Sequence, residues 1–385
     1  MRLALTGAGT VSPFGVGRAS WDDALRRGFD ARADAFRGAS EVLGAEIVDP
    51  NTAEVWGWDA KKHLGKKGHR SFDRLTKFLI AAAQEALADA GLRPKDGTLA
   101  LEPDAVGVCS ATAYGSLDAI TELNRVAELE DPRYINPTRF PNTVINAAAG
   151  YVSIWLDLRG PNTTIVAGNC GALDAMLTAA THLELGRGRA FLVGGGEVVS
   201  EPLFRALERL GVIAREGRAG VEMGEGAAYV VVERPEDAKA RGANVLADFV
   251  GYGTAFEPPS SEALLVDASP DAVARACEGA LEMAGLSAGD VDVICSAEGG
   301  IEEIDAAERE GLARLFDVPR VALKRVHGET FGAAGAFGMA AALAWLNDVP
   351  FPASSGTKLP SKLDTVLVST LGFYGNASAV VLQRA

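Results

Sequence analysis

The chain has 385 residues, 48% of them hydrophobic, so it is long and apolar enough to bury a core without a disulfide or a metal staple. Its net charge of −14 disfavours nonspecific binding to nucleic acid, and it lacks the run of about 18 apolar residues that a transmembrane helix needs. The cysteines lack metal-ligand spacing, so we expect reduced thiols of a cytoplasmic protein at Cys109, Cys170, Cys277 and Cys295.

Glycines follow short β-branched runs along the chain, as they do where strands enter tight turns. Apolar segments predict strands over 2–7, 104–110, 163–168, 189–194, 227–233, 245–252, 291–296 and 365–371. Helical periodicity predicts helices over 73–91, 171–187, 269–286 and 303–316. The strands lack polar alternation, which indicates an α/β protein with a sheet covered on both faces. The glycine run 194–196 opens no dinucleotide fingerprint, so we expect no nucleotide cofactor and no metal site.

A coarse repeat divides the chain into two similar parts. Residues 73–110 run through a helix, a Gly-Leu pair, an aspartate and a strand, and residues 269–296 repeat that order. Each part then has a glycine-rich helix near its middle. This pattern predicts two α/β halves, over 1–236 and 244–385, joined by a short connection.

One stretch reverses the sign of the chain's charge. Against one acid, Asp73, residues 61–77 hold the basic side chains Lys61, Lys62, Lys66, Lys67, Arg70, Arg74 and Lys77. Such a stretch fits either a solvated loop and helix start or a docking surface for an acidic partner.

Several segments, in the right order, resemble the β-ketoacyl synthase family, which has the thiolase fold. They are Thr6–Gly17 (TGAGTVSPFGVG), Pro141–Cys170, Glu222–Ala243, Ser296–Gly300 (SAEGG), Lys324–Gly335 (KRVHGETFGAAG) and Gly372–Ser378 (GFYGNAS). The resemblance covers nearly the whole chain. It implies five layers, αβαβα, built from two pseudo-repeated halves.

The resemblance also implies a reaction that this sequence is poorly equipped to perform. The family takes up an acyl group on a cysteine at a helix N-terminus, and two histidines stabilise the enolate that forms next. Counting from the Gly-Pro pair places Asn169 at the nucleophile position, with Cys170 one step out of register. The histidine positions fall on Glu298 and Glu329, while Lys324 is retained. We therefore expect no catalytic residue here and a non-condensing site around these positions.

A synthase-like chain without the catalytic cysteine and both histidines resembles the chain length factor, or ketosynthase β subunit, of type II polyketide or polyene systems. Such a subunit pairs with an active β-ketoacyl synthase and shapes its acyl-chain tunnel, in polyketide or fatty-acid-like biosynthesis. Family geometry points to Thr112, Tyr114, Arg139 and Phe140 as tunnel or interface residues. The expected partners are that synthase and an acyl carrier protein, with no nucleic acid and no membrane. Carrier docking would use Lys66, Lys67 and Arg70.

Other activities remain open at this stage. Cys170, Glu298 and His327 are the residue types of a rearranged acyl-transfer site, in which Cys170 is the nucleophile of an active condensing enzyme. A malonyl decarboxylase is another possibility, although that chemistry relies on the two missing histidines. A homodimer that binds acyl groups is a further one.

Overall fold

The computed structural model describes residues 1–94, 97–261, 266–351, 359–360 and 362–385. The strands are β1 (Leu3–Ser12), β2 (Gly15–Val16), β3 (Val106–Ala111), β4 (Asn162–Ile165), β5 (Ala190–Glu197), β6 (Gly226–Glu233), β7 (Ala247–Phe256), β8 (Val293–Ser296), β9 (Arg320–Ala322), β10 (Thr365–Leu371) and β11 (Asn376–Gln383). The α-helices are α1 (Arg18–Arg27), α2 (Arg32–Ala35), α3 (Ala60–Leu64), α4 (Arg74–Asp89), α5 (Leu117–Leu129), α6 (Ala147–Leu156), α7 (Gly171–Glu184), α8 (Glu201–Arg209), α9 (Pro235–Ala240), α10 (Pro270–Ala284), α11 (Glu302–Ala313), α12 (Lys324–His327) and α13 (Ala334–Leu346).

The strands fall into two sets with the same order of partners. The first set runs β4-β3-β5-β6-β1, and the second runs β9-β8-β10-β11-β7. In each set the first three strands are parallel and the last two join antiparallel. The sets meet where β1 pairs with β7 over Leu3–Leu5. The connectivity is thus a repeat, and α9 lies in the connection between the two sets.

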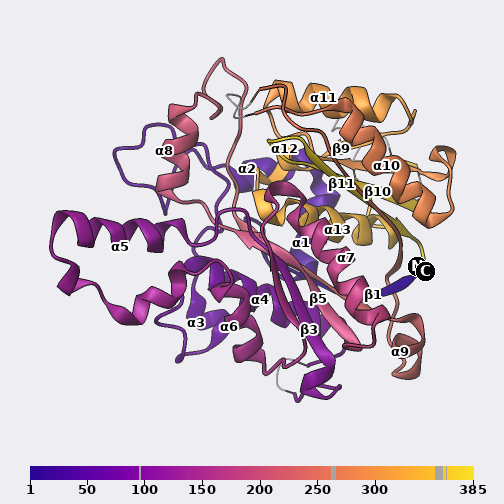
Figure 1. Ribbon diagram of the computed structural model, residues 1–385, viewed down its shortest axis with the longest axis horizontal. Coiled ribbons are helices and arrows are strands. Elements are labelled where there is room, and N and C mark those ends of the chain that lie inside the picture. Colours follow the sequence, from indigo (N-terminus) through magenta and orange to yellow (C-terminus); the bar gives the residue numbers. More distant parts are fainter. Residues whose placement is uncertain (95–96, 262–265, 352–358, 361) are drawn as a thin grey trace.

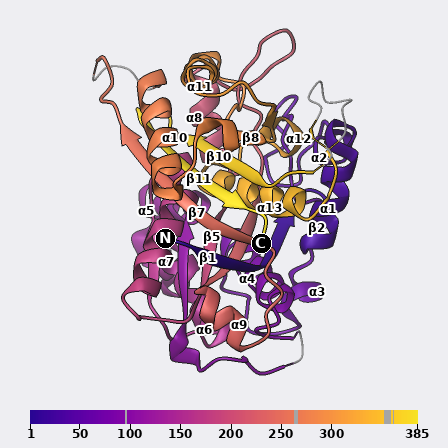
Figure 2. The same cartoon turned by 90° about the vertical axis from the view of Figure 1, so that its right-hand side faces the viewer.

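Helices and strands alternate in five layers, which is the thiolase fold. One outer layer holds α4 and α6, the other holds α10 and α11, and α7 and α13 lie between the two strand sets (Figure 1). Figure 2 shows α13 in the same central position from the side. Buried apolar residues form three clusters. One surrounds the central helices α7 and α13, and the other two lie between each outer helix layer and its strand set. Successive residues of one strand therefore enter different clusters, so both faces of the sheet are buried.

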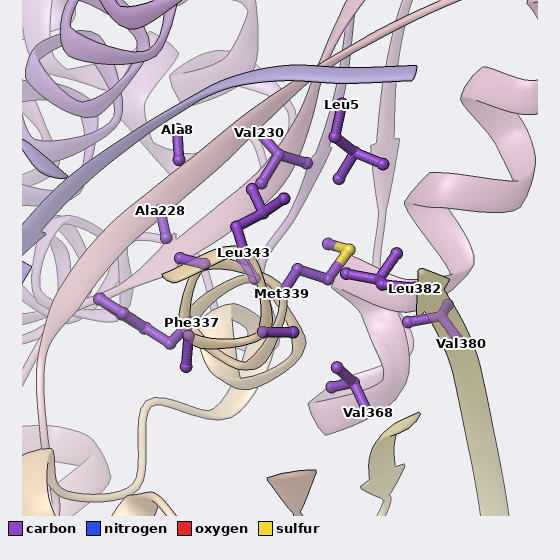
Figure 3. Packing of buried hydrophobic residues seen from close by; sticks show 14 of the residues in the cluster. Leu5, Ala8, Ala228, Val230, Phe337, Met339, Leu343, Val368, Val380 and Leu382 are labelled. Atoms are coloured by element: carbon purple, nitrogen blue, oxygen red, sulfur yellow. The ribbon is translucent and has the colours of Figure 1, made fainter. Parts of the chain in front are cut away.

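Helix α13 is the centre of the largest cluster because its sequence is apolar on every side. All of its side chains from Ala334 to Leu346 are buried, as expected for a helix without a solvent face. Figure 3 shows Phe337, Met339 and Leu343 between strands of the first set, at Val230, and strands of the second set, at Val368.

Glycines on equivalent strands let equivalent helices approach closely. A Cβ on Gly9 of β1 would lie 2.2 Å from the carbonyl oxygen of Ala82 in α4. A Cβ on Gly253 of β7 would lie 2.0 Å from that of Ala276 in α10. No side chain fits at either distance, so the two outer helices pack on backbone in the same manner.

Where the helices begin also follows from the sequence. The Asp73 carboxylate caps α4 by accepting from the backbone N–H of Thr76, and Ser269 caps α10 in the same way. None of the described helices is both long and apolar enough to cross a bilayer.

Candidate functional site

Asn169 and Cys170 lie at the start of α7, where the short 3₁₀ helix η5 (Gly168–Cys170) runs into it. Their side chains point in different directions, as expected for neighbours turned by about 100° on a helix. The Asn169 Nδ2 atom donates to Glu329 Oε2 at 3.3 Å. The Cys170 Sγ atom lies 3.6 Å from the backbone carbonyls of Thr370 and Asn376, on β10 and β11.

The Cys170 thiol is poorly suited to act as a nucleophile. It is 1% exposed, and burial, together with the nearby Asp174 carboxylate, raises its pKa to about 11. The reactive form of a cysteine is the thiolate, so the side chain is protonated and inert at neutral pH.

Glu329 lies at the centre of a buried ion pair that faces the start of α7. Its Oε2 atom accepts from Lys324 Nζ at 2.7 Å as well as from Asn169, and its Oε1 atom accepts from the backbone N–H of Phe331 at 2.7 Å. The two charged side chains are only 6% and 2% exposed. We call Asn169, Lys324 and Glu329 the Asn169 cluster. The amide and the ammonium group are both directed at the Glu329 carboxylate, so the three side chains form one connected cluster.

The Glu298 carboxylate pairs with groups outside this cluster, although the neighbouring Gly299 lies against Glu329 and Lys324. The Glu298 carboxylate lies 3.6 Å from Arg309 and 3.8 Å from Arg325 and is 15% exposed. The two guanidinium groups attract it away from Glu329, whose carboxylate carries the same charge.

The rearranged acyl-transfer site is not assembled either. His327 is 1% exposed, and its ring lies 5.4 Å from that of Trp21 and 4.9 Å from that of Phe337. Burial, followed by the charge of Lys324, lowers the pKa of this imidazole to about 3. Cys170, Glu298 and His327 each contact a different set of neighbours, so they do not form a triad.

Two hollows of very different size adjoin the Asn169 cluster. A cavity of about 10 Å³ is lined by the cluster and by apolar side chains that include Val221, Ile301 and Phe373, and it has room for about one water molecule. The loops that carry its wall are in contact, since a Cβ on Gly300 would lie 2.1 Å from the carbonyl oxygen of Gly220. A larger cleft of about 700 Å³ lies on the other side of Lys324 and Gly299 and is lined mainly by polar and charged side chains such as Arg32 and Glu222.

The residues expected at the tunnel divide between a buried and an exposed group. Thr112 and Tyr114 follow β3, with Thr112 3% exposed and the Tyr114 ring 5.3 Å from that of Phe331. Burial raises the pKa of Tyr114 to about 12. Arg139 and Phe140 lie in the 3₁₀ helix η4 (Pro137–Thr143), on the surface of this chain. Arg139 pairs with Glu122 at 3.0 Å.

A buried carboxylate that we did not predict holds the segment after β3. Glu197, at the end of β5, is 1% exposed and accepts from Thr112 Oγ1 at 3.0 Å and from the backbone N–H of Ala113 at 2.6 Å. Burial raises its pKa to about 7, which these hydrogen bonds oppose. The only sequence signal was an acid closing an apolar strand, directly after three glycines.

The basic stretch divides as well. Lys66, Lys67 and Arg70 are exposed in the loop between α3 and α4. Arg74 is not part of that surface, because its guanidinium pairs with Glu225, a carboxylate with no exposed surface. We call residues 65–70 the basic loop. Its Gly68 packs against the Trp155 ring of α6.

Models of known families match both parts of the chain. The β-ketoacyl synthase N-terminal domain matches residues 1–238, and the C-terminal domain matches residues 246–358. The 3-oxoacyl-[acyl-carrier-protein] synthase 2 of Rhizobium meliloti is 30% identical, over 100% of this chain and 99% of that protein. The protein of the same name from Coxiella burnetii is 28% identical, over 100% and 98%.

Solved structures agree with the fold. The ishigamide ketosynthase/chain length factor superposes with a TM-score of 0.86 at 23% identity, covering 100% of this chain and 99% of that one. A β-ketoacyl synthase from Burkholderia phymatum gives 0.82 at 24% identity, with the same coverage. A type II polyketide acyl-carrier protein in complex with its ketosynthase gives 0.80 at 23%, again with the same coverage. The match to both domain models and the full-length relatives shows that this chain belongs to the β-ketoacyl synthase family.

Proposed function

We propose that this chain is a non-condensing subunit, a chain length factor, that pairs with an active β-ketoacyl synthase. The observation that carries the proposal is the Asn169 cluster. An amide stands where the family has its nucleophile, and it bonds to a carboxylate that is already paired with Lys324. An amide does not attack a thioester, and a carboxylate does not donate to an enolate oxygen unless it is protonated.

Charge argues in the same direction. Decarboxylative condensation would bring a malonyl carboxylate into this pocket, where Glu329 already carries a negative charge with both of its oxygens engaged. Two carboxylates at short distance in a buried site repel each other strongly. The cavity that contacts Asn169 itself, about 10 Å³, is also too small for an acyl group.

A partner is supported by the surface that this chain leaves uncovered. We call residues 116–145 the arm: α5 has no buried residue, and Figure 1 shows it projecting from the body. On the arm and the adjoining α6 and β4, the exposed large apolar side chains are Leu129 (77%), Tyr134 (70%), Phe140 (61%), Val144 (48%), Ile145 (40%), Ile154 (75%) and Val166 (54%). Strand β4 is a free edge of the sheet. A concentration of exposed apolar side chains on neighbouring elements is typical of a protein–protein interface.

The kind of partner follows from the chemistry that is missing. A synthase-like subunit without a nucleophile contributes to acyl-chain assembly only beside one that has it. The ishigamide structure, to which this fold is similar, is named as a ketosynthase/chain length factor. On this proposal Arg139 and Phe140 in the arm meet the partner and border its tunnel, while Thr112 and Tyr114 set the arm's base.

The basic loop is proposed as a docking surface for an acyl carrier protein. Lys66, Lys67 and Arg70 are exposed, and the loop packs on α6 beside the apolar surface described above. A carrier bound there would lie next to the partner subunit. A polyketide carrier in complex with its ketosynthase is among the similar structures, which makes a carrier the natural acidic ligand to test.

The test is co-expression of this chain with active ketosynthases from the same genome, followed by co-purification and a condensation assay. We expect a 1:1 heterodimer that elongates carrier-bound malonyl units, and no condensation by this chain alone. A chain that always purifies free of every such synthase would overturn the proposal.

A second candidate, a condensing enzyme that uses Cys170, is favoured by the names of the curated relatives, which are 3-oxoacyl-[acyl-carrier-protein] synthases. Incubation with an acyl thioester and intact mass analysis separates the two. An adduct on the wild-type chain that disappears in Cys170→Ala would establish this second candidate. We expect no adduct on either.

A further inference from the structure

We propose that the Asn169 cluster is retained as an anchor that positions the arm, acting through the short 3₁₀ helix η7 (Phe331–Ala333). Glu329 and Glu197 are then positioning residues, on either side of η7. The proposal rests on the proposed function only in regarding the arm as the surface that meets a partner. The mechanical coupling itself concerns this chain alone.

The first step fixes η7 to the cluster. Glu329 accepts from the backbone N–H of Phe331 at 2.7 Å with one oxygen and from Lys324 with the other. Phe331 has a φ of 42°, a left-handed backbone conformation that a bulky residue adopts only where its surroundings enforce it. The carboxylate that enforces it is held by a buried cation, so η7 has one position while the ion pair is intact.

The second step carries that position to the base of the arm. A Cβ on Gly332 would lie 2.5 Å from the backbone nitrogen of Ala113, so the backbone of η7 lies directly against the segment after β3. The Phe331 ring packs edge-on to that of Tyr114, with centroids 5.3 Å apart. Glu197 accepts from Ala113 N–H and from Thr112 on the side of β5. The segment is thus held between η7 and β5.

The third step links the segment to the whole arm. The Thr112 hydroxyl accepts from the backbone N–H of Gly115 at 3.0 Å. Gly115 is the last residue before the arm begins. A Cβ on Gly115 would lie 2.7 Å from the Ile145 side chain, so the two ends of the arm meet at this point. Since α5 has no fully buried residue, its orientation depends on these contacts at the base together with its packing against α8 and η4.

This coupling would give the buried Lys324–Glu329 ion pair a structural role. A buried pair is weak evidence for stability, because an apolar pair of similar volume often packs as well. A charged group that also fixes a strained backbone segment is harder to replace, because apolar side chains would fill the volume without holding Phe331 N–H.

Hydrogen exchange measured by mass spectrometry on the full chain tests the proposal from both ends. Glu329→Gln should speed amide exchange over residues 112–129 by about tenfold, the effect of weakening one buried charged hydrogen bond. Thr112→Val, which removes the hydroxyl at the other end, should in turn speed exchange over 331–333, because coupling between sites is reciprocal. Exchange is compared at several protein concentrations, so that protection by a second copy is recognised.

The matched control is Glu233→Gln, which removes another carboxylate without exposed surface from its ion pair with Arg241, remote from η7. It should lower global stability without a selective effect on the arm. If Glu329→Gln and Glu233→Gln change exchange over 112–129 alike, Glu329 merely supports the fold and the proposal is overturned. If Glu329→Gln does not fold, an unchanged exchange rate over 331–333 in Thr112→Val overturns it. Neither measurement involves a partner, so heterodimer formation and this coupling succeed or fail separately.

Discussion

Both charged groups of the Asn169 cluster are buried against partners in their own chain, whereas the arm leaves apolar side chains such as Leu129 and Phe140 uncovered. The first region is complete without a ligand, and the second is incomplete without a neighbour. The charges of the cluster are therefore satisfied within the chain, whereas the arm has the features of an interface.

The contrast indicates where to look for the function of this chain. Buried polar residues satisfy one another where no ligand competes for them. Exposed apolar residues cannot do so and need another molecule. Substitutions in the two regions should therefore have opposite signatures, with stability affected in one and association in the other.

The largest effect is expected from Lys324→Met. Removing the cation leaves Glu329 buried and unpaired, which should lower the free energy of unfolding by about 3–5 kcal/mol. The double substitution Lys324→Met with Glu329→Leu removes both charges and should recover only part of that loss, because the backbone N–H of Phe331 then lacks its acceptor. Urea unfolding followed by circular dichroism measures both. Equal losses in the single and double variants would show that the packing of the long side chains, and not the charge pair, matters here.

A substitution in the arm should instead weaken association and leave stability unchanged. Phe140 is 61% exposed, so Phe140→Asp should leave the free energy of unfolding within about 0.5 kcal/mol of wild type. It should weaken the heterodimer by about 2–4 kcal/mol, the range of an interface hot spot. Titration calorimetry or analytical ultracentrifugation with the co-expressed synthase measures this. Val48→Asp, 75% exposed outside the arm, is the matched control and should change neither quantity.

A smaller and pH-dependent effect is expected at Glu197. Burial raises its pKa from 4.5 to about 7, so between these values the folded protein binds more protons than the unfolded chain. Its contribution should therefore be fully present below pH 4.5 and should decline as pH rises to 7, by at most about 1.4 kcal/mol per pH unit. Other buried acids share this behaviour, so the informative quantity is the difference between wild type and Glu197→Gln. Parallel stability profiles across this pH range would contradict the prediction.

The fold was predictable from the sequence where burial is continuous. The expected strand over 365–371 matches β10, all of whose residues are buried. Helix α5 was not predicted, because its apolar stripe is only half-buried, against α8 and η4, and contributes no fully buried residue to the core. The caps at Asp73 and Ser269 explain why the expected starts of α4 and α10 differ from the observed ones by a single residue.

The site was less predictable, because spacing determines backbone position and not side-chain direction. Asn169, Lys324 and Glu329 occupy equivalent family positions, and the structure brings them together. Glu298 also occupies such a position, but arginines from other helices decide where its carboxylate points. The partners of Glu197 include backbone N–H groups, which leave no trace in a sequence.

The smallest effect is expected in the basic loop, which belongs to neither region but lies beside the arm's apolar surface. Reversing Lys66, Lys67 and Arg70 to Glu should leave stability unchanged, because all three are exposed. In the assembled heterodimer the apparent KM for carrier-bound substrate should rise about tenfold at low salt, mainly through slower association. The difference should fade above about 0.5 M salt, where the Debye length is only a few ångströms.

A matched charge reversal at Arg187, Lys239 and Arg314, away from the arm, should leave that KM unchanged although it alters net charge equally. If both triple variants behave alike, the carrier responds to overall charge. If neither changes the KM or the yield of heterodimer, the basic loop is solvated surface. Only a selective effect at the basic loop would place carrier docking on this chain, beside the subunit that performs the chemistry.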